Sequence, residues 1–240
     1  MKKQTVIALI ISLTILTFVI FFLTYMPEEK EPIQIIDGDI IELPTPALTG
    51  VMSVEQAIKK RRSVRSYTDE PLNLNEISQL MWAVQGITEP NRKLRAVPSA
   101  GATYPLEVFI AIGENGVIGL NSGLYRYNPY AHSLIKELEG DLRFDLAGAA
   151  LGQEFIYDAP INIIITAIYE RTTARYGDRG IRYVHLEAGH AGQNLHLQGV
   201  ALNLGMVMVG AFRDDEVRNI LHLTEDYSIL YIIPVGHPHT

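Results

Sequence analysis

The stretch INIIITAI, residues 161–168, decides the fold of this chain. It is rich in β-branched side chains and almost uninterrupted by polar ones, a pattern typical of a strand that is covered on both faces. Such a strand needs a layer of other elements on each side. The stretch therefore predicts the middle of a layered domain.

Further helices and strands are predicted on both sides of this stretch. Helices are expected at 53–61, 74–86, 141–151, 179–204 and 214–222. The first opens with a capping box at Ser53, the second is capped by Asn73 and the last by Asp214. Strands are expected at 107–112, 124–127, 133–137, 206–212 and 228–235. The mixed order and the long non-local connections predict an α+β fold, in the form of a three-layer α/β sandwich.

The first 26 residues differ from the rest in hydropathy. Residues 5–26 are apolar apart from Ser and Thr and carry no charge, and about 20 such residues in a helix span the ~30 Å hydrocarbon core of a bilayer. Lysines precede the segment and acidic residues follow it, so the positive-inside rule places the N-terminus in the cytoplasm and the body outside. We expect residues 1–26 to be a single-pass membrane anchor. A cleaved signal peptide is the alternative, and a buried core helix is disfavoured because the segment is apolar on every side.

Two further segments follow the expected anchor. Residues 27–50 contain four prolines, and their charged residues are mainly acidic. This composition is typical of a linker or of an extended arm that lies against the body. Residues 51–240 are expected to form one domain.

Composition excludes several classes of protein. The chain is 48% hydrophobic, which excludes disorder, and its net charge of −7 argues against nucleic acid as a partner. The absence of cysteine excludes disulfides, thiolate metal sites and iron–sulfur clusters.

A dense cationic stretch, KKRRSVRSY at 59–67, stands out in this acidic chain. Arginine forks pair with phosphate oxygens and a hydroxyl adds a donor, so one phosphate group can be held by Arg61, Arg62, Ser63 and Arg65. The alternative is a solvated helix C-terminus, where cations complement the helix dipole. Spacing alone does not decide between the two.

Three other segments are rich in small residues. The loop PSAGATYP at 98–105 offers backbone that a flat ligand can approach closely. Gly210 and Ala211 end a predicted strand, as does the segment PVGHP, which contains His237. Each pattern alone is more typical of an ordinary loop or bend.

Several other kinds of site are not supported. Glycines at 113, 116 and 119 follow a strand without opening a helix, so there is no dinucleotide fingerprint, and no P-loop is present. The histidines at 185, 190 and 196 do not stack on one helical face, so no metal site is expected. Ser99 lacks a nucleophile elbow.

Taken in order, the motifs of this chain resemble the nitroreductase-like flavoprotein superfamily, and within it the SagB-type thiazoline/oxazoline dehydrogenase branch. The similarity extends from about residue 41 to 238 and rests on eight segments: RRSVRSYTDEPL (61–72), ISQLMWAVQGIT (77–88), PSAGATYPLEVFIAIG (98–113), GLYRYNP (123–129), ALGQEF (150–155), ERTTARYGDRGIRYVHLEAGHAGQNL (170–195), LGMVMVGAF (204–212) and PVGHP (234–238). One such motif is weak evidence, whereas eight in the same order are specific. The resemblance implies an FMN-binding sandwich that forms a homodimer with the flavin at the subunit interface.

The resemblance also implies roles for the candidate residues. Those that would hold the FMN phosphate and ribityl chain are Arg61, Arg62, Ser63 and Arg65. Those that would lie against the isoalloxazine are Pro98, Ser99, Ala100 and Gly101, with backbone contacts from Gly210 and Ala211. His237 stands where the family often has an Arg or Lys that reaches the phosphate, and it carries a full charge only when protonated.

The family's azoline dehydrogenases have a Lys-Tyr pair where this chain has Arg175 and Tyr176, and that pair is thought to deprotonate the azoline carbon as hydride passes to the flavin. Arginine remains protonated and cannot serve as that base. Tyr176 can still exchange a proton and Arg175 can hold an anionic substrate, so both are candidate catalytic residues.

The activity that the resemblance implies is an FMN-dependent oxidoreductase that transfers hydride through flavin N5. Its substrate stays open between a nitroaromatic or quinone-like acceptor, with NAD(P)H as a transient donor, and a C–N bond in a peptide-derived heterocycle. The alternative is a non-catalytic, membrane-tethered flavin-binding or scaffold protein, because the lysine is missing and FMN and NAD(P)H are scarce outside the cytoplasm.

Overall fold

The computed structural model of the chain describes residues 38–239. The anchor predicted for residues 5–26 and the first part of the predicted linker lie outside the described residues. Between residues 38 and 239, no helix is both long enough and apolar enough to cross a membrane.

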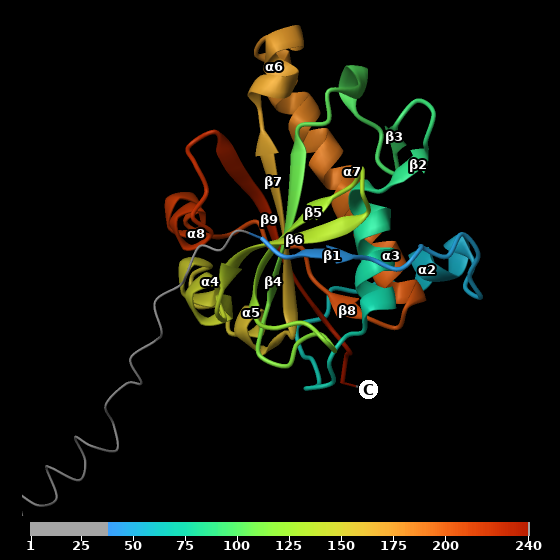
Figure 1. Cartoon of the computed structure of the whole chain (residues 1–240), viewed down its shortest axis with the longest axis vertical. Helices are drawn as coiled ribbons and strands as arrows, with labels where there is room; N and C mark the ends of the chain where they lie inside the picture. The colour runs from blue at the N-terminus through green and yellow to red at the C-terminus, as the bar shows by residue number, and fades with distance from the viewer. Residues whose placement is uncertain (1–37, 240) are drawn as a thin grey trace, which may run out of the picture. The chain divides into compact units, whose positions relative to one another are not determined.

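An antiparallel sheet of seven strands forms the middle of the domain (Figure 1). Its order is β1-β6-β5-β4-β7-β9-β8, and the strands are β1 (Ile40–Glu42), β4 (Leu106–Ile112), β5 (Gly123–Asn128), β6 (Ser133–Glu139), β7 (Ile161–Ile168), β8 (Gly205–Met206) and β9 (Tyr227–Gly236). The stretch 161–168 is strand β7 and pairs with β4 on one side and β9 on the other. A separate two-stranded ribbon consists of β2 (Ile87–Glu89) and β3 (Leu94–Arg95).

Helices cover both faces of the sheet, and the alternation along β4 shows how. Val108 and Ile110 belong to a core with α3 (Leu74–Gln85) and α7 (Arg179–Ala201). Phe109 belongs to a second core, with three shorter helices, α4 (Arg143–Ala149), α5 (Phe155–Asp158) and α8 (Asp214–Ile220). Because successive side chains of a strand point to opposite faces, one buried strand serves both cores. In Figure 1 the two sets of helices lie on opposite sides of the sheet, so the predicted three-layer α+β sandwich is confirmed.

Residues 38–50 lie against the domain as an arm. Strand β1 pairs with β6, and the side-chain amide of Gln79 bonds both the N–H and the C=O of Ala47, at 2.9 and 3.0 Å. Buried Ser78 donates to the carbonyl of Pro44. These buried polar side chains hold the arm on α3.

The capping boxes at Ser53 and Asn73 are present, at the starts of α2 (Val54–Lys60) and α3. The prediction that Asp214 caps the last helix is wrong. That helix begins at Asp214, and the residue before it, Arg213, makes no side-chain cap bond. Three acids therefore occupy the first turn, where the helix dipole favours them.

The predicted strand 206–212 is also wrong in its length. Only Gly205–Met206 forms a ladder with β9. Val209 and Ile232 exchange both backbone hydrogen bonds further along in the same register. Between these pairs the chain faces Pro234, which has no N–H to donate, so the ladder is interrupted.

Candidate functional site

The cationic loop 61–65 follows α2 and is fixed at one end of the sheet. Ser63 bridges to Met206 of β8, and the N–H of Val64 donates to the carbonyl of Met206 at 3.0 Å. The ring nitrogen Nε2 of His196, on α7, lies 3.0 Å from the carbonyl oxygen of Arg62. The backbone of the loop is therefore held in place while its side chains face outward.

The helix C-terminus alternative describes Arg62, and the phosphate alternative stays a prediction for the loop. Arg62 donates to the carbonyls of Lys59 and Arg61, at 3.1 and 2.7 Å, and so caps the C-terminus of α2. The guanidinium of Arg65 lies 5.7 Å from the ring centre of Phe155. Within residues 38–239, no carboxylate forms an ion pair with Arg61, Arg62 or Arg65. The loop thus presents three cations and the exposed hydroxyl of Ser63, which suits a phosphate group.

Gly210 and Ala211 lie beside the turn before α5. The side-chain amide of Gln153 donates to the carbonyl of Ala211 at 3.0 Å. Two residues further on, Phe155 contacts Arg65. Gly210 is exposed, with open space where a Cβ would stand. Ala211 is therefore connected to the cationic loop through the segment that carries Gln153 and Phe155.

The side chain of His237 points toward Glu76 and not toward the cationic loop. Its carbonyl accepts from the N–H of Thr68 at 2.8 Å, which places its backbone beside the chain that follows the cationic loop. Its imidazole Nε2 lies 3.8 Å from Oε1 of Glu76, at the start of α3. The side-chain contact of His237 is thus a carboxylate and not one of the predicted phosphate ligands.

The loop Pro98–Gly101 packs against α6 (Glu170–Tyr176), and the residues directly after it are strained. Positive φ angles occur at Gly101 (60°), Ala102 (54°) and Tyr104 (47°), and non-glycine residues hold such angles only under constraint. A Cβ at Gly101 would lie 2.5 Å from the Tyr176 hydroxyl and 2.8 Å from Nη1 of Arg175. Arg175 Nη1 also donates to the carbonyl of Gly101 at 3.3 Å. The two candidate catalytic residues therefore contact the loop predicted to face the flavin ring.

The cationic loop and the Pro98–Gly101 loop lie at opposite ends of the sheet. At one end, Leu106 pairs with Ala167, directly after the small-residue loop and before α6. At the other end, Met206 of β8 pairs with Val235, and Val235 pairs in turn with Ile161, the first residue of β7. A strand of seven residues such as β4 is about 20 Å long. Figure 1 shows this separation, with α6 at the top and β8 toward the bottom.

Sequence reasoning missed a buried polar cluster behind the small-residue loop. Glu187 on α7 is 3% exposed, and burial raises the pKa of its carboxyl to about 7, against the opposing effects of Ser99 and Arg95. The position of Glu187 in the sequence pattern was a signal of this cluster. Glu187 follows Val184 by three residues and precedes Ala191 by four, which places an acid on the apolar face of the helix.

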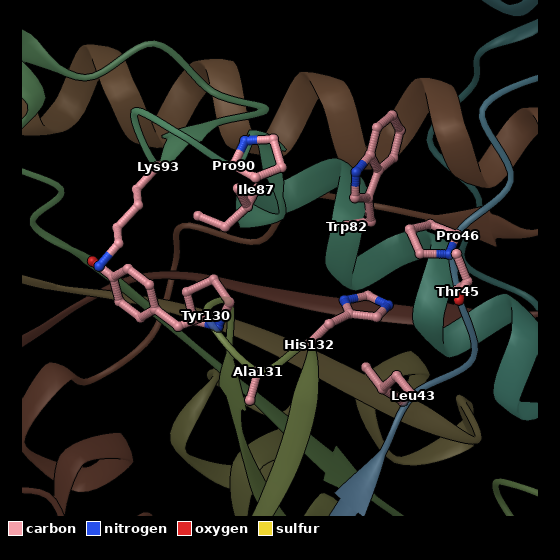
Figure 2. A pocket seen from close by; sticks show the side chains of 11 residues that line it. Leu43, Thr45, Pro46, Trp82, Ile87, Pro90, Lys93, Tyr130, Ala131 and His132 are labelled. Atoms are coloured by element: carbon pink, nitrogen blue, oxygen red, sulfur yellow. The ribbon is translucent and has the colours of Figure 1, made fainter.

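A separate cavity of about 580 Å³ lies beside the arm (Figure 2). Trp82 and His132 face it on one side, and Lys93 and Tyr130 face it on another. None of the predicted site residues lines it. Elsewhere in the described residues, no cluster of His, Asp and Glu side chains could hold a metal ion.

Comparison with known proteins defines the class. The nitroreductase family model matches residues 58–237, so the chain belongs to the nitroreductase family. A Methanocaldococcus jannaschii protein named as a nitroreductase is 47% identical over 199 residues, which is 83% of this chain and 98% of that protein.

Further similarities are to a trifolitoxin operon protein, to a chain of a microcin synthetase and to a second nitroreductase. The trifolitoxin operon protein TfxC of Rhizobium leguminosarum is 23% identical over 75% of this chain. A chain of the E. coli microcin synthetase McbBCD complex has the same fold, with a TM-score of 0.66 and 22% identity over 89% of this chain and 80% of that chain. A nitroreductase structure from Anabaena variabilis has a TM-score of 0.74 and 34% identity over 84% of this chain. This chain spans only 54% of TfxC and 42% of the Anabaena chain.

Proposed function

We propose that this protein is an FMN-dependent oxidoreductase whose flavin is shared between two copies of the chain. One observation carries the proposal: the cationic loop and the small-residue loop lie at opposite ends of the sheet of one chain, which are separated by the length of a strand, about 20 Å. In the proposed arrangement one copy supplies the cationic loop for the phosphate and a second copy supplies the small-residue loop for the flavin ring. A two-fold dimer then contains two such sites.

The residues present fit this cofactor. Three arginines without described carboxylate partners suit the phosphate, and the loop Pro98–Gly101 has no side chain bulky enough to keep a flat ring away. Bound FMN would supply hydride acceptance at N5, while the protein orients it and tunes its surroundings. Tyr176 would hold or release a proton at its hydroxyl, beside Gly101. Arg175 would orient an anionic substrate group through its guanidinium.

We propose a peptide-derived heterocycle as the first substrate class to test, because relatives are named for trifolitoxin processing and for microcin synthesis. A nitroaromatic or quinone acceptor with NAD(P)H as donor is the second class. Stopped-flow bleaching of the flavin by NADH, NADPH or an azoline peptide distinguishes them. A flavin that binds but that none of these reduces would favour the non-catalytic alternative.

A mixed-dimer experiment tests the shared site. The double variant Arg61→Ala/Arg65→Ala removes the phosphate ligands, and Gly101→Val fills the small-residue loop. Each variant alone is expected to lose FMN, measured by visible absorbance. If sites are shared, co-expressed mixed dimers regain one intact site of two, because the intact halves meet across the interface. No regained flavin in verified mixed dimers would show that each site lies within one chain.

We also propose that residues 5–26 anchor the protein in a membrane with residues 38–239 outside the cytoplasm. The support is the apolar, uncharged character of that segment and its flanking charges. Protease accessibility in whole cells and in permeabilised cells tests it. A body that is cleaved only after permeabilisation would place it on the cytoplasmic side.

A further inference from the structure

Unpartnered buried polar atoms gather behind the loop Pro98–Gly101. Among the described residues, buried side-chain atoms without a hydrogen-bond partner are Gln85 Nε2, Arg95 Nε, Glu187 Oε1 and Asn162 Oδ1. The first three belong to one cluster, since Arg95 Nη1 donates to Gln85 Oε1 at 2.8 Å and both residues act on the carboxyl of Glu187. Buried polar groups are normally paired, and leaving them unpaired destabilises the fold. Such a concentration at one place points to a functional role.

The cluster is connected directly to the small-residue loop. The guanidinium of Arg95 lies 4.4 Å from the ring centre of Tyr104. The N–H of Tyr104 donates to the hydroxyl oxygen of Ser99 at 3.0 Å, and the Ser99 side chain lowers the pKa of the Glu187 carboxyl. A change of charge on Glu187 therefore changes the electrostatic potential at Ser99 and at the backbone around it.

The charges that face Glu187 are few. Strand β3 contributes the cation Arg95, the loop contributes the hydroxyl of Ser99, and α3 contributes only the neutral amide of Gln85. Helix α6 places Arg175 and Tyr176 against Gly101 of the same loop. With burial raising its pKa to about 7, the carboxyl of Glu187 changes charge within the physiological range.

We propose that Glu187 is a positioning residue that takes a proton from solvent and returns it, and that through Arg95 and Ser99 it sets the charge behind the flavin-facing loop. The inference rests on the proposed function, in which that loop lies against FMN. When Glu187 is ionised, it offsets the charge of Arg95. When Glu187 is protonated, Arg95 is uncompensated and favours the more negatively charged, reduced form of the cofactor.

The first experiment needs no cofactor. In the FMN-free protein labelled with ¹³C at glutamate carboxyls, one resonance is expected to titrate near pH 7 and to be absent from Glu187→Gln. The matched control Glu225→Gln, at an exposed turn, retains it. In Arg95→Met the same resonance titrates at higher pH, because the nearby cation is gone. Absence of a resonance that titrates near neutrality in the unmodified protein overturns the proposal.

The second experiment measures the flavin potential against pH in the FMN-loaded protein. The unmodified protein is expected to show a steeper fall of potential around pH 7 than Glu187→Gln, and Glu225→Gln is expected to match the unmodified protein. Bound FMN with the same slope in all three proteins overturns this inference alone. Failure of the unmodified protein to bind FMN overturns the proposed function instead, and with it the role assigned to Glu187.

Discussion

Arg175 Nη1 donates a hydrogen bond to the carbonyl of Gly101 at 3.3 Å. This contact joins α6 to the loop that precedes β4, two segments more than 70 residues apart in sequence. It leaves the Arg175 guanidinium beside a backbone that holds a φ of +60° at Gly101. The loop therefore holds the position of this exposed guanidinium.

Gly101→Ala is expected to lower the free energy of unfolding by about 1–2 kcal/mol, because an L-residue at φ +60° is strained and its Cβ would meet the Tyr176 hydroxyl. Thermal unfolding measures this. The matched control is Gly148→Ala in α4, where a Cβ has open space and helix propensity favours alanine. An equal melting temperature for Gly101→Ala and the unmodified protein would contradict the argument.

Arg61→Ala combined with Arg65→Ala is expected to weaken FMN binding by at least about 100-fold, because each charge-assisted hydrogen bond contributes roughly 1.5–3 kcal/mol. Fluorescence titration of FMN measures the dissociation constant. Lys59→Ala with Lys60→Ala removes the same charge from the same stretch and is expected to have a much smaller effect. Similar losses in both double variants would mean that only the net charge of the stretch matters.

Arg175→Lys is expected to introduce azoline oxidation, because a lysine can lose its proton and act as a base whereas arginine cannot. Single-turnover bleaching of the flavin by an azoline peptide measures the gain. The control is Arg179→Lys, an exposed position at the start of α7. If Arg175→Lys remains as slow as the control, the missing lysine does not explain the substrate range.

We expect the folded state to lose stability at low pH because of Asp141. Burial opposes ionisation, but hydrogen bonds from Arg143 and its charge more than offset this and hold the pKa of Asp141 below its usual range. A carboxyl with a depressed pKa in the folded state contributes stability above its unfolded pKa of about 4, and that stability is lost as pH falls below it. Urea unfolding between about pH 3 and 7 should therefore show a fall that Asp141→Asn reduces. The exposed Asp69→Asn serves as control, and equal pH profiles for both variants would refute the assignment.

Local patterns predicted much of this fold. The β-branched stretch 161–168 and the capping residues Ser53 and Asn73 act through their own backbone and nearest neighbours, so they could be located from sequence. The length of the strand after Gly205 could not be predicted, because it depends on Pro234 facing it from β9. The ribbon β2–β3 and helix α6 also escaped prediction.

The candidate site also has parts that the sequence predicts and parts that only the structure shows. The cationic loop and the small-residue loop are visible as residue types in short segments, whereas their placement at opposite ends of the sheet follows only from strand pairing. The cluster of Gln85, Arg95 and Glu187 joins three distant segments. The one signal of this cluster in the sequence is Glu187, an acid on the apolar face of α7.

The cavity beside the arm contains the only tryptophan of the chain. Trp82 stands on α3, between the arm and the hairpin that carries Lys93 (Figure 2). Its fluorescence therefore comes from one known place in the molecule, against no background from other indoles. The protein carries a built-in optical reporter, able to register release of the arm or entry of a molecule into that cavity without any added label.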